Sequence, residues 1–181
     1  TGKPCSGKST VAKILASKYG FEHIAIGNIF KEEANKRGIT IEEFNKLCSS
    51  DSSFDQLIDN ETARIGRDRA NEKLIFDSRM AWHFVPHSFK VYLDLSEDEM
   101  ANRLLNSDRK DKYIYKNKES ALNSLLNREK LEIERYNKLY NVNMADPNNY
   151  DLVISSENIS PEGLADIIYS EYLKHIENSK K

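Results

Sequence analysis

Long hydrophobic runs are absent from this sequence, and no apolar stretch approaches the ~20 residues that a membrane-spanning helix needs. This absence argues against a membrane protein. Cysteine is also scarce, because Cys5 and Cys48 are the two present and their spacing matches no metal-binding pattern. We therefore expect both to be reduced thiols in a cytoplasmic protein.

A large excess of charge of either sign is missing as well, since the formal net charge is −2. This balance argues against a broad surface for nucleic acid or membrane. Internal repeats and low-complexity tracts are not found either. The 181 residues are 39% hydrophobic and 31% charged, which predicts one globular domain over 1–181. We expect a monomer or a weak homo-oligomer.

The most specific motif of the chain is at its start, where residues 2–9 fit the phosphate-loop pattern G-x-x-x-x-G-K-[ST]. The glycines let backbone N–H groups fold around phosphate oxygens, the lysine reaches the terminal phosphates, and the hydroxyl binds Mg²⁺. A helical pattern over 10–19 follows, so a helix N-terminus faces the anion. The alternative is a Gly/Ser-rich turn before an ordinary helix. The residues predicted to bind nucleotide phosphate are Gly2, Lys3, Pro4, Cys5, Ser6, Gly7, Lys8, Ser9 and Thr10.

A phosphate loop is normally fed by a buried strand, and the sequence begins at Thr1, which leaves no residues for it. Either the natural chain extends upstream, or the sheet lacks its central strand. We favour the first interpretation, because loss of a central parallel strand would leave the backbone of both neighbours unpaired.

Short apolar runs alternate with longer helical patterns, which predicts a parallel sheet with helices on both faces. Thr40 with Glu43 and Ser96 with Glu99 fit helix N-terminal caps, and Asn28 could cap another helix. The polar segment 107–118 is expected to be solvated and mobile. The predicted strands are 22–26, 74–77, 89–95 and 151–155, and the later helices lie at 28–38, 40–47, 54–71, 96–105, 120–140 and 160–176.

Asp77 ends a predicted strand, and ligands of open α/β sheets bind at the carboxyl ends of strands. A carboxylate beside a phosphate loop can hold the water shell of Mg²⁺, so Ser9 and Asp77 are the candidate metal residues. The alternatives are a helix cap or turn at Asp77, with Asp94 as the competing acid. Arg79 follows closely, and a guanidinium can grip a phosphate with two hydrogen bonds.

Four more arginines surround the polar segment: Arg103, Arg109, Arg128 and Arg135. Arg128 and Arg135 are two helical turns apart and lie at the edge of the apolar stripe, from where they could point into a cleft. Glu132 lies between them at contact spacing, so ordinary salt bridges are the alternative. As a group, these arginines could close over a migrating phosphoryl group and exclude water.

Two acids, Asp55 and Asp59, share one face of the helix predicted at 54–71. They could face solvent, or they could accept hydrogen bonds from the amino group or the sugar hydroxyls of a bound nucleoside. Packing is the interpretation for Trp82, His83 and His87, and none of the three is given a catalytic role.

The order of these residues along the chain, from the phosphate loop to the last arginines, resembles that of the nucleoside monophosphate kinases, in particular an archaeal-type cytidylate kinase branch. Beyond the phosphate loop, the resemblance covers most of the chain. The matching segments are 27–34, Phe54-Asp55, Ile58-Asp59, 77–82, Arg128-Glu129 through Arg135-Tyr136, Tyr140, 150–154 and 160–163.

The resemblance implies an α/β P-loop kinase fold with a five-stranded parallel sheet, a helical acceptor-binding part at about 28–72 and a mobile lid at about 105–130. Lys8 would hold the phosphates of ATP, Ser9 and Asp77 would serve Mg²⁺, and Arg79 would hold the acceptor monophosphate. Arg103, Arg109, Arg128 and Arg135 would be candidates for closing over the phosphoryl group.

The chain departs from that family at positions that bear on the substrate. Lys31 stands where the family usually has an arginine for the acceptor phosphate, and Ser78 replaces a usual glycine. The expected reaction is phosphorylation of CMP or dCMP. The alternatives are a kinase of another small molecule, such as a sugar, a shikimate-like acid or a drug, and a nucleotide-binding regulator without transfer activity.

Overall fold

The computed structural model describes residues 1–107 and 115–179. Within these ranges, four parallel strands form two pairs, β1 (Glu22–Ala25) with β2 (Leu74–Asp77) and β3 (Val91–Asp94) with β4 (Leu152–Ser155). The strands fall within the four segments predicted from sequence, and their parallel direction is confirmed. A single continuous sheet was predicted, whereas the described strands pair two by two.

The start of the chain runs along β3. Gly2 forms a parallel bridge with Leu93, the Lys3 N–H donates to the Leu93 carbonyl at 3.0 Å, and the Leu93 N–H donates to the Thr1 carbonyl at 3.0 Å. A Cβ at Gly2 would lie 2.2 Å from the Leu93 oxygen, so only glycine allows this approach. Residues 1–3 thus bring the phosphate loop to the carboxyl end of β3.

A cavity of about 310 Å³ is lined by both β2 and β3 together with α1 (Lys8–Tyr19) and α8 (Pro161–Ser179). Its apolar lining includes Val11, Ile75 and Val91. The further central strand expected from the sequence is not tested by the described residues and stays a prediction.

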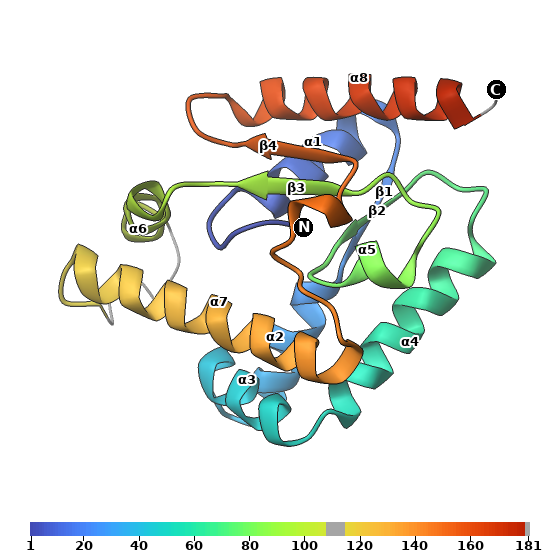
Figure 1. Cartoon of the computed structure of the whole chain (residues 1–181). Helices are drawn as coiled ribbons and strands as arrows, with labels where there is room; N and C mark the ends of the chain where they lie inside the picture. The colour runs from blue at the N-terminus through green and yellow to red at the C-terminus, as the bar shows by residue number, and fades with distance from the viewer. Residues whose placement is uncertain (108–114, 180–181) are drawn as a thin grey trace.

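Helices cover both sides of the strands (Figure 1). Helix α8 runs along β4 and packs on α1, while α7 lies on the opposite side of β3, with α2 and α3 beyond it and α4 at its carboxyl end. The remaining helices are α2 (Ile26–Lys36), α3 (Ile41–Ser50), α4 (Ser53–Asp68), α5 (Ala81–Phe84), α6 (Glu97–Leu105) and α7 (Lys118–Tyr140), with a 3-10 turn, η2, at Pro147–Asn149.

Several helix ends follow the predicted signals. The Thr40 hydroxyl accepts from the Glu43 N–H at 3.1 Å while the Glu43 carboxylate accepts from the Thr40 N–H at 2.7 Å, a complete capping box for α3. The Ser96 cap is likewise confirmed. The prediction for Asn28 was wrong, because β1 runs directly into α2, which begins at Ile26 and leaves Asn28 in its first turn.

The hydrophobic core is divided among separate clusters rather than gathered in one. Between the strands, α1 and α8 are Val11, Leu15, Leu93, Leu164, Ala165 and Ile168. Between α6 and α7 are Leu95, Met100, Leu104, Ala121 and Leu125. Two smaller clusters consist of Ala34, Phe44 and Cys48 in α2 and α3, and of Met80, Tyr136 and Met144 beside α7.

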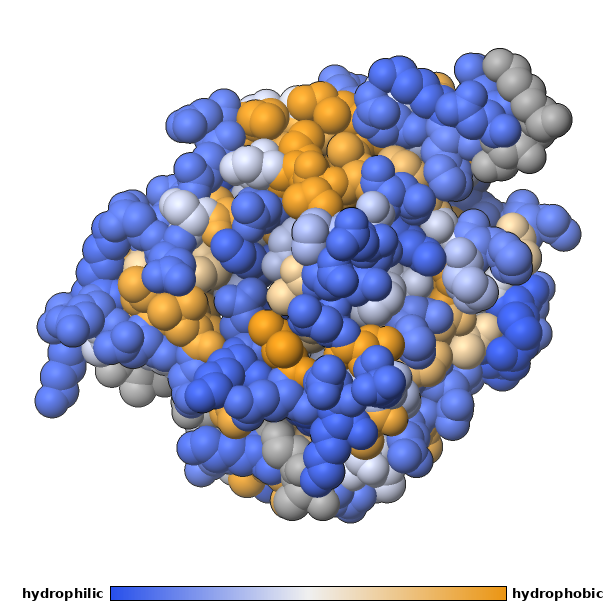
Figure 2. All heavy atoms as spheres, in the orientation of Figure 1, coloured by the Kyte–Doolittle hydropathy of each residue, from blue (hydrophilic) through white to orange (hydrophobic). Residues whose placement is uncertain are grey.

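Polar side chains cover most of the face in Figure 2, and apolar atoms gather over β4 and α8, which carry the exposed Val153 and Ile167. Among the described residues no helix is both long enough and apolar enough to cross a membrane. The segment predicted to be mobile is 107–118. Its residues 108–114 lie outside the described part of the chain, so that prediction is not tested.

Candidate functional site

The phosphate loop winds around the start of α1. Cys5 and Gly7 have positive φ angles of 59° and 86°, and the Gly7 carbonyl accepts from the Val11 N–H at 3.0 Å as the helix begins. This geometry points the unpaired N–H groups of the first helical turn toward the loop, where an anion is favoured.

The Lys8 ammonium is folded back over this loop. Its Nζ donates to the carbonyls of Gly2 at 2.9 Å and Lys3 at 2.5 Å, and it lies 3.4 Å from the Ser6 hydroxyl. Burial lowers the pKa of Lys8 well below its usual range, and the neighbouring Arg79 guanidinium lowers it further. The negative charge of a bound phosphate would counter both effects and favour the protonated form of Lys8.

Ser9 and Asp77, the two candidate metal residues, are in direct contact. The Ser9 hydroxyl donates to the Asp77 carboxylate at 2.5 Å, and His23 on β1 lies 3.5 Å from the same carboxylate oxygen. A hydroxyl and a carboxylate side by side at the loop supply the hard oxygen ligands that Mg²⁺ prefers, so the residues fit this ion. Asp94, the competing acid, instead pairs with Lys3 at 2.9 Å.

Arg79 reaches the phosphate loop from the turn between β2 and α5. Its Nη1 donates to the Gly2 carbonyl at 2.6 Å, the same oxygen that Lys8 contacts. The lysine predicted for one phosphate group and the arginine predicted for the other therefore meet at a single atom. Two cations converging at one carbonyl create a site of concentrated positive charge beside the loop.

Glu132 on α7 holds Arg79 from the other side. Its two carboxylate oxygens lie 2.9 Å from Nε of Arg79 and 3.0 Å from Nε of Arg128. The structure thus joins Arg79 and Arg128 through one buried acid.

Arg135 lies farther along α7, where it faces α4 instead of the loop. Its Nε is 3.5 Å from the carboxylate of Asp55, which is 1% exposed, and its guanidinium lies over the Tyr136 ring. Burial raises the pKa of Asp55. Arg135 and Asp55 therefore form a buried ion pair that links α7 to α4.

Asp59 lies one turn beyond Asp55 and accepts a hydrogen bond from the Tyr140 hydroxyl at 2.7 Å. Burial raises the pKa of Asp59 from 3.8 to about 6, against the opposing effect of that hydrogen bond. Both acids face inward, so the alternative that they simply face solvent was wrong.

The remaining predicted residues do not join Lys8, Arg79, Arg128 and Glu132. Arg103 donates to the Ser156 carbonyl at 2.7 Å and pairs with Glu99, and it lines a cavity of about 520 Å³ together with phosphate-loop residues. It therefore lies beside the phosphate loop, apart from Arg128. Lys31 is exposed on α2, and Arg109 lies outside the described residues.

Three residues that the sequence did not single out for the site belong to it by contact. Glu132 was considered only as a salt-bridge partner, yet it joins two predicted arginines from different elements. His23 meets Asp77, and Tyr140 meets Asp59. Glu132 could have been found from its helical spacing to Arg128, whereas nothing in the local sequence links His23 to Asp77.

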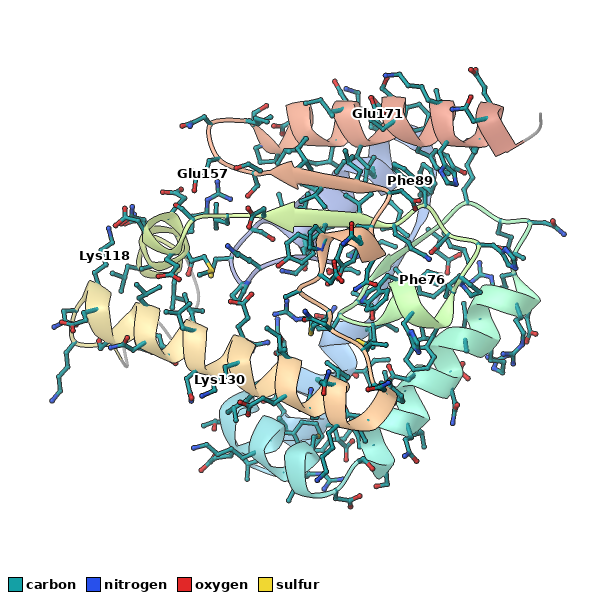
Figure 3. All side chains as sticks on the ribbon, viewed as in Figure 1. Phe76, Phe89, Lys118, Lys130, Glu157 and Glu171 are labelled. Carbon is teal, nitrogen blue, oxygen red and sulfur yellow. The ribbon has the colours of Figure 1, made fainter. Side chains whose placement is uncertain are left out.

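One more side chain connects the elements around Arg103. Glu157, labelled in Figure 3 in the turn before α8, accepts from the Ser96 N–H at 2.7 Å. This bond ties the start of α6, the helix that carries Arg103, to the end of β4.

Comparison with known proteins gives matches over most of the chain. Residues 1–121 match a family model described as an AAA domain. The chain is 35% identical to a cytidylate kinase of Natronomonas pharaonis over 172 residues, 94% of this chain and 85% of the relative. It is 33% identical to a cytidylate kinase of Methanocella arvoryzae over 181 residues, 100% of this chain and 97% of the relative.

Among solved structures, a shikimate kinase of Bacteroides thetaiotaomicron superposes with a TM-score of 0.61 over 98% of this chain and 96% of its own. The sequences are 14% identical, so this likeness concerns the fold alone. It is consistent with the predicted P-loop kinase fold.

Proposed function

The chain belongs to the cytidylate kinase family, and on that premise we propose that it transfers the γ-phosphoryl group of ATP to the 5′-phosphate of CMP or dCMP. The products are the nucleoside diphosphate and ADP. The observation that carries this proposal is the convergence of Lys8 and Arg79 on the Gly2 carbonyl. A lysine that binds the donor phosphates and an arginine that binds the acceptor phosphate must lie this close for direct transfer.

The acceptor phosphate is itself the nucleophile and is ionised at neutral pH, so no dedicated base is required. Positioning and neutralisation of charge then provide most of the catalysis. Lys8 and the loop N–H groups would bind the donor phosphates, and Arg79 and Arg128 would approach the acceptor and the migrating group. Mg²⁺, held through Ser9 and Asp77, would offset the negative charge of the donor phosphates.

The helices α2 to α4 form the acceptor-binding part in this proposal, corresponding to about 28–72. Asp55 and Asp59 would hold Arg135 and Tyr140 beside the nucleoside. Lys31 would contribute positive charge at the edge of the acceptor-binding part. The segment at about 105–130 would act as the lid, with Arg109 within it and Arg103 on the nucleotide side.

The test is a panel of nucleoside monophosphates and hydroxyl acceptors offered with γ-labelled ATP. We expect label in CDP and dCDP above every other product. Arg79→Ala should lower turnover by roughly a hundredfold or more, because it removes the cation at the acceptor phosphate, while leaving the circular dichroism unchanged. Preferred transfer to a hydroxyl acceptor would indicate another small-molecule kinase, and ATP binding without any transfer would indicate a regulator.

A further inference from the structure

Glu132 is an ionisable residue in an unusual position, because its side chain is almost wholly buried on α7 between two arginines. It is 4% exposed, yet it carries one guanidinium on each oxygen, Arg79 on one and Arg128 on the other. Burial alone would raise the pKa of Glu132, but the Arg79 and Arg128 charges lower it to about 2. The carboxylate is therefore ionised at neutral pH.

The two arginines come from different parts of the molecule. Arg128 is one turn before Glu132 on α7, whereas Arg79 lies in the turn after β2. The Nε of Arg79 lies 2.9 Å from Glu132 as an ion pair without hydrogen-bond geometry, and its Nη1 donates to the Gly2 carbonyl, so the guanidinium spans from α7 to the phosphate loop.

Stabilisation of the fold is a poor explanation for such an arrangement. Buried ion pairs frequently contribute little net stability, because removing the charges from water costs about as much as their attraction returns. A shared acid does, however, hold two flexible side chains at one spacing, which is what a tetrahedral anion needs.

We propose that Glu132 is a positioning residue that holds the guanidiniums of Arg79 and Arg128 at the separation required by the acceptor phosphate. This inference rests on the proposed function, since it gives that phosphate to these two arginines. Glu132 itself does not touch the substrate. Its effect is transmitted through Arg79 and Arg128.

The test compares Glu132→Gln with Glu134→Gln on the same helix. Glutamine keeps the shape of Glu132 but removes the charge, whereas Glu134 is exposed and pairs only loosely with Lys130, at 3.9 Å. We expect Glu132→Gln to raise the KM for CMP about tenfold and to change the KM for ATP less than about twofold. Glu134→Gln should leave both constants unchanged.

A change in both Michaelis constants by the same factor, or in neither, would overturn the proposal. Epistasis gives a second criterion. In an Arg79→Lys background, Glu132→Gln should raise the KM for CMP by less than about twofold, because residues that act through one another are not additive. Full additivity would contradict a role through Arg79.

Two further measurements keep the outcome decisive. If Glu132→Gln does not fold, Glu132→Asp retains the charge but is one methylene too short to meet both guanidiniums, and an unchanged KM for CMP in it would reject the idea. If the wild-type protein does not phosphorylate CMP, the proposed function fails. The inference is then decided by titrating inorganic phosphate onto protein saturated with a non-hydrolysable ATP analogue, where Glu132→Gln should weaken binding about tenfold and equal affinities would reject it.

Discussion

Single residues in this site lie in surroundings that disfavour their charged forms. Lys8 is half-buried against neutral carbonyls, and the buried Asp59 accepts a hydrogen bond from the Tyr140 hydroxyl. Each environment carries a cost in the free energy of folding, because removal of water disfavours the charged form. Such costs are tolerated at binding sites, where a ligand of the complementary charge offsets them.

Asp59 provides a prediction about pH. Its pKa is 3.8 in the unfolded chain and about 6 in the folded protein, so the folded state binds more protons between these values. The stability contributed by protonation is therefore complete near pH 4 and is lost as pH rises through 6. Asp59→Asn should match wild type near pH 4 and exceed its free energy of unfolding near pH 7, by at most roughly 3 kcal/mol.

Urea unfolding of both proteins at the two pH values measures this difference. Asp68→Asn is the matched control on the same helix, because Asp68 is exposed and pairs with Arg64 at 2.9 Å. Its offset from wild type should be similar at both pH values. A pH-independent offset for Asp59→Asn would show that burial does not disfavour the Asp59 carboxylate.

At the scale of elements, α7 connects the two sides of the site. One face carries Arg128 and Glu132 toward the phosphate loop, and the next turn carries Arg135 and Tyr136 toward α4. The sequence predicted this helix, and the spacing placed Arg128 and Arg135 near its apolar stripe. The pairing of Arg128 with Glu132 follows from their spacing on the helix. The sequence could not predict that Arg135 pairs with Asp55 or that Glu132 also meets Arg79, because partners on other elements depend on packing.

Helix α3 allows a test of local capping signals. Thr40→Ala removes a capping box and should lower the free energy of unfolding by about 1 kcal/mol, and the Tm by about 2–4 °C. Ser52→Ala is the matched control at the start of α4, since the Ser52 side chain makes no capping bond and Asp51 accepts from the Ser53 N–H instead. Thermal melts of both variants decide whether the box at Thr40 stabilises the protein, and equal shifts would contradict it.

Across the whole molecule, the sequence predicted well those features that depend on residues close together along the chain. The phosphate loop, the four strands and the Thr40 cap were predictable because each is encoded within a few residues. The pairing of strands two by two and the junction of Arg79 with Glu132 were not, because they join positions about 50 or more residues apart. Local chemistry identified the parts of the site, and only the fold determined which parts meet.

The divided core makes a final prediction at this scale. Helices α2 and α3 share a small cluster of their own, separate from the one that joins α1 and α8 to the strands, so the two layers can open independently. We expect ADP to slow amide hydrogen exchange in α1, and CMP to slow it in α3 and α4, by up to about a hundredfold at a hundred times Kd. In Arg79→Ala the effect of CMP should disappear while that of ADP remains. Protection of α1 alone by CMP would place the acceptor outside the α2–α4 layer, because a ligand slows exchange only where its binding must be lost for the amides to open.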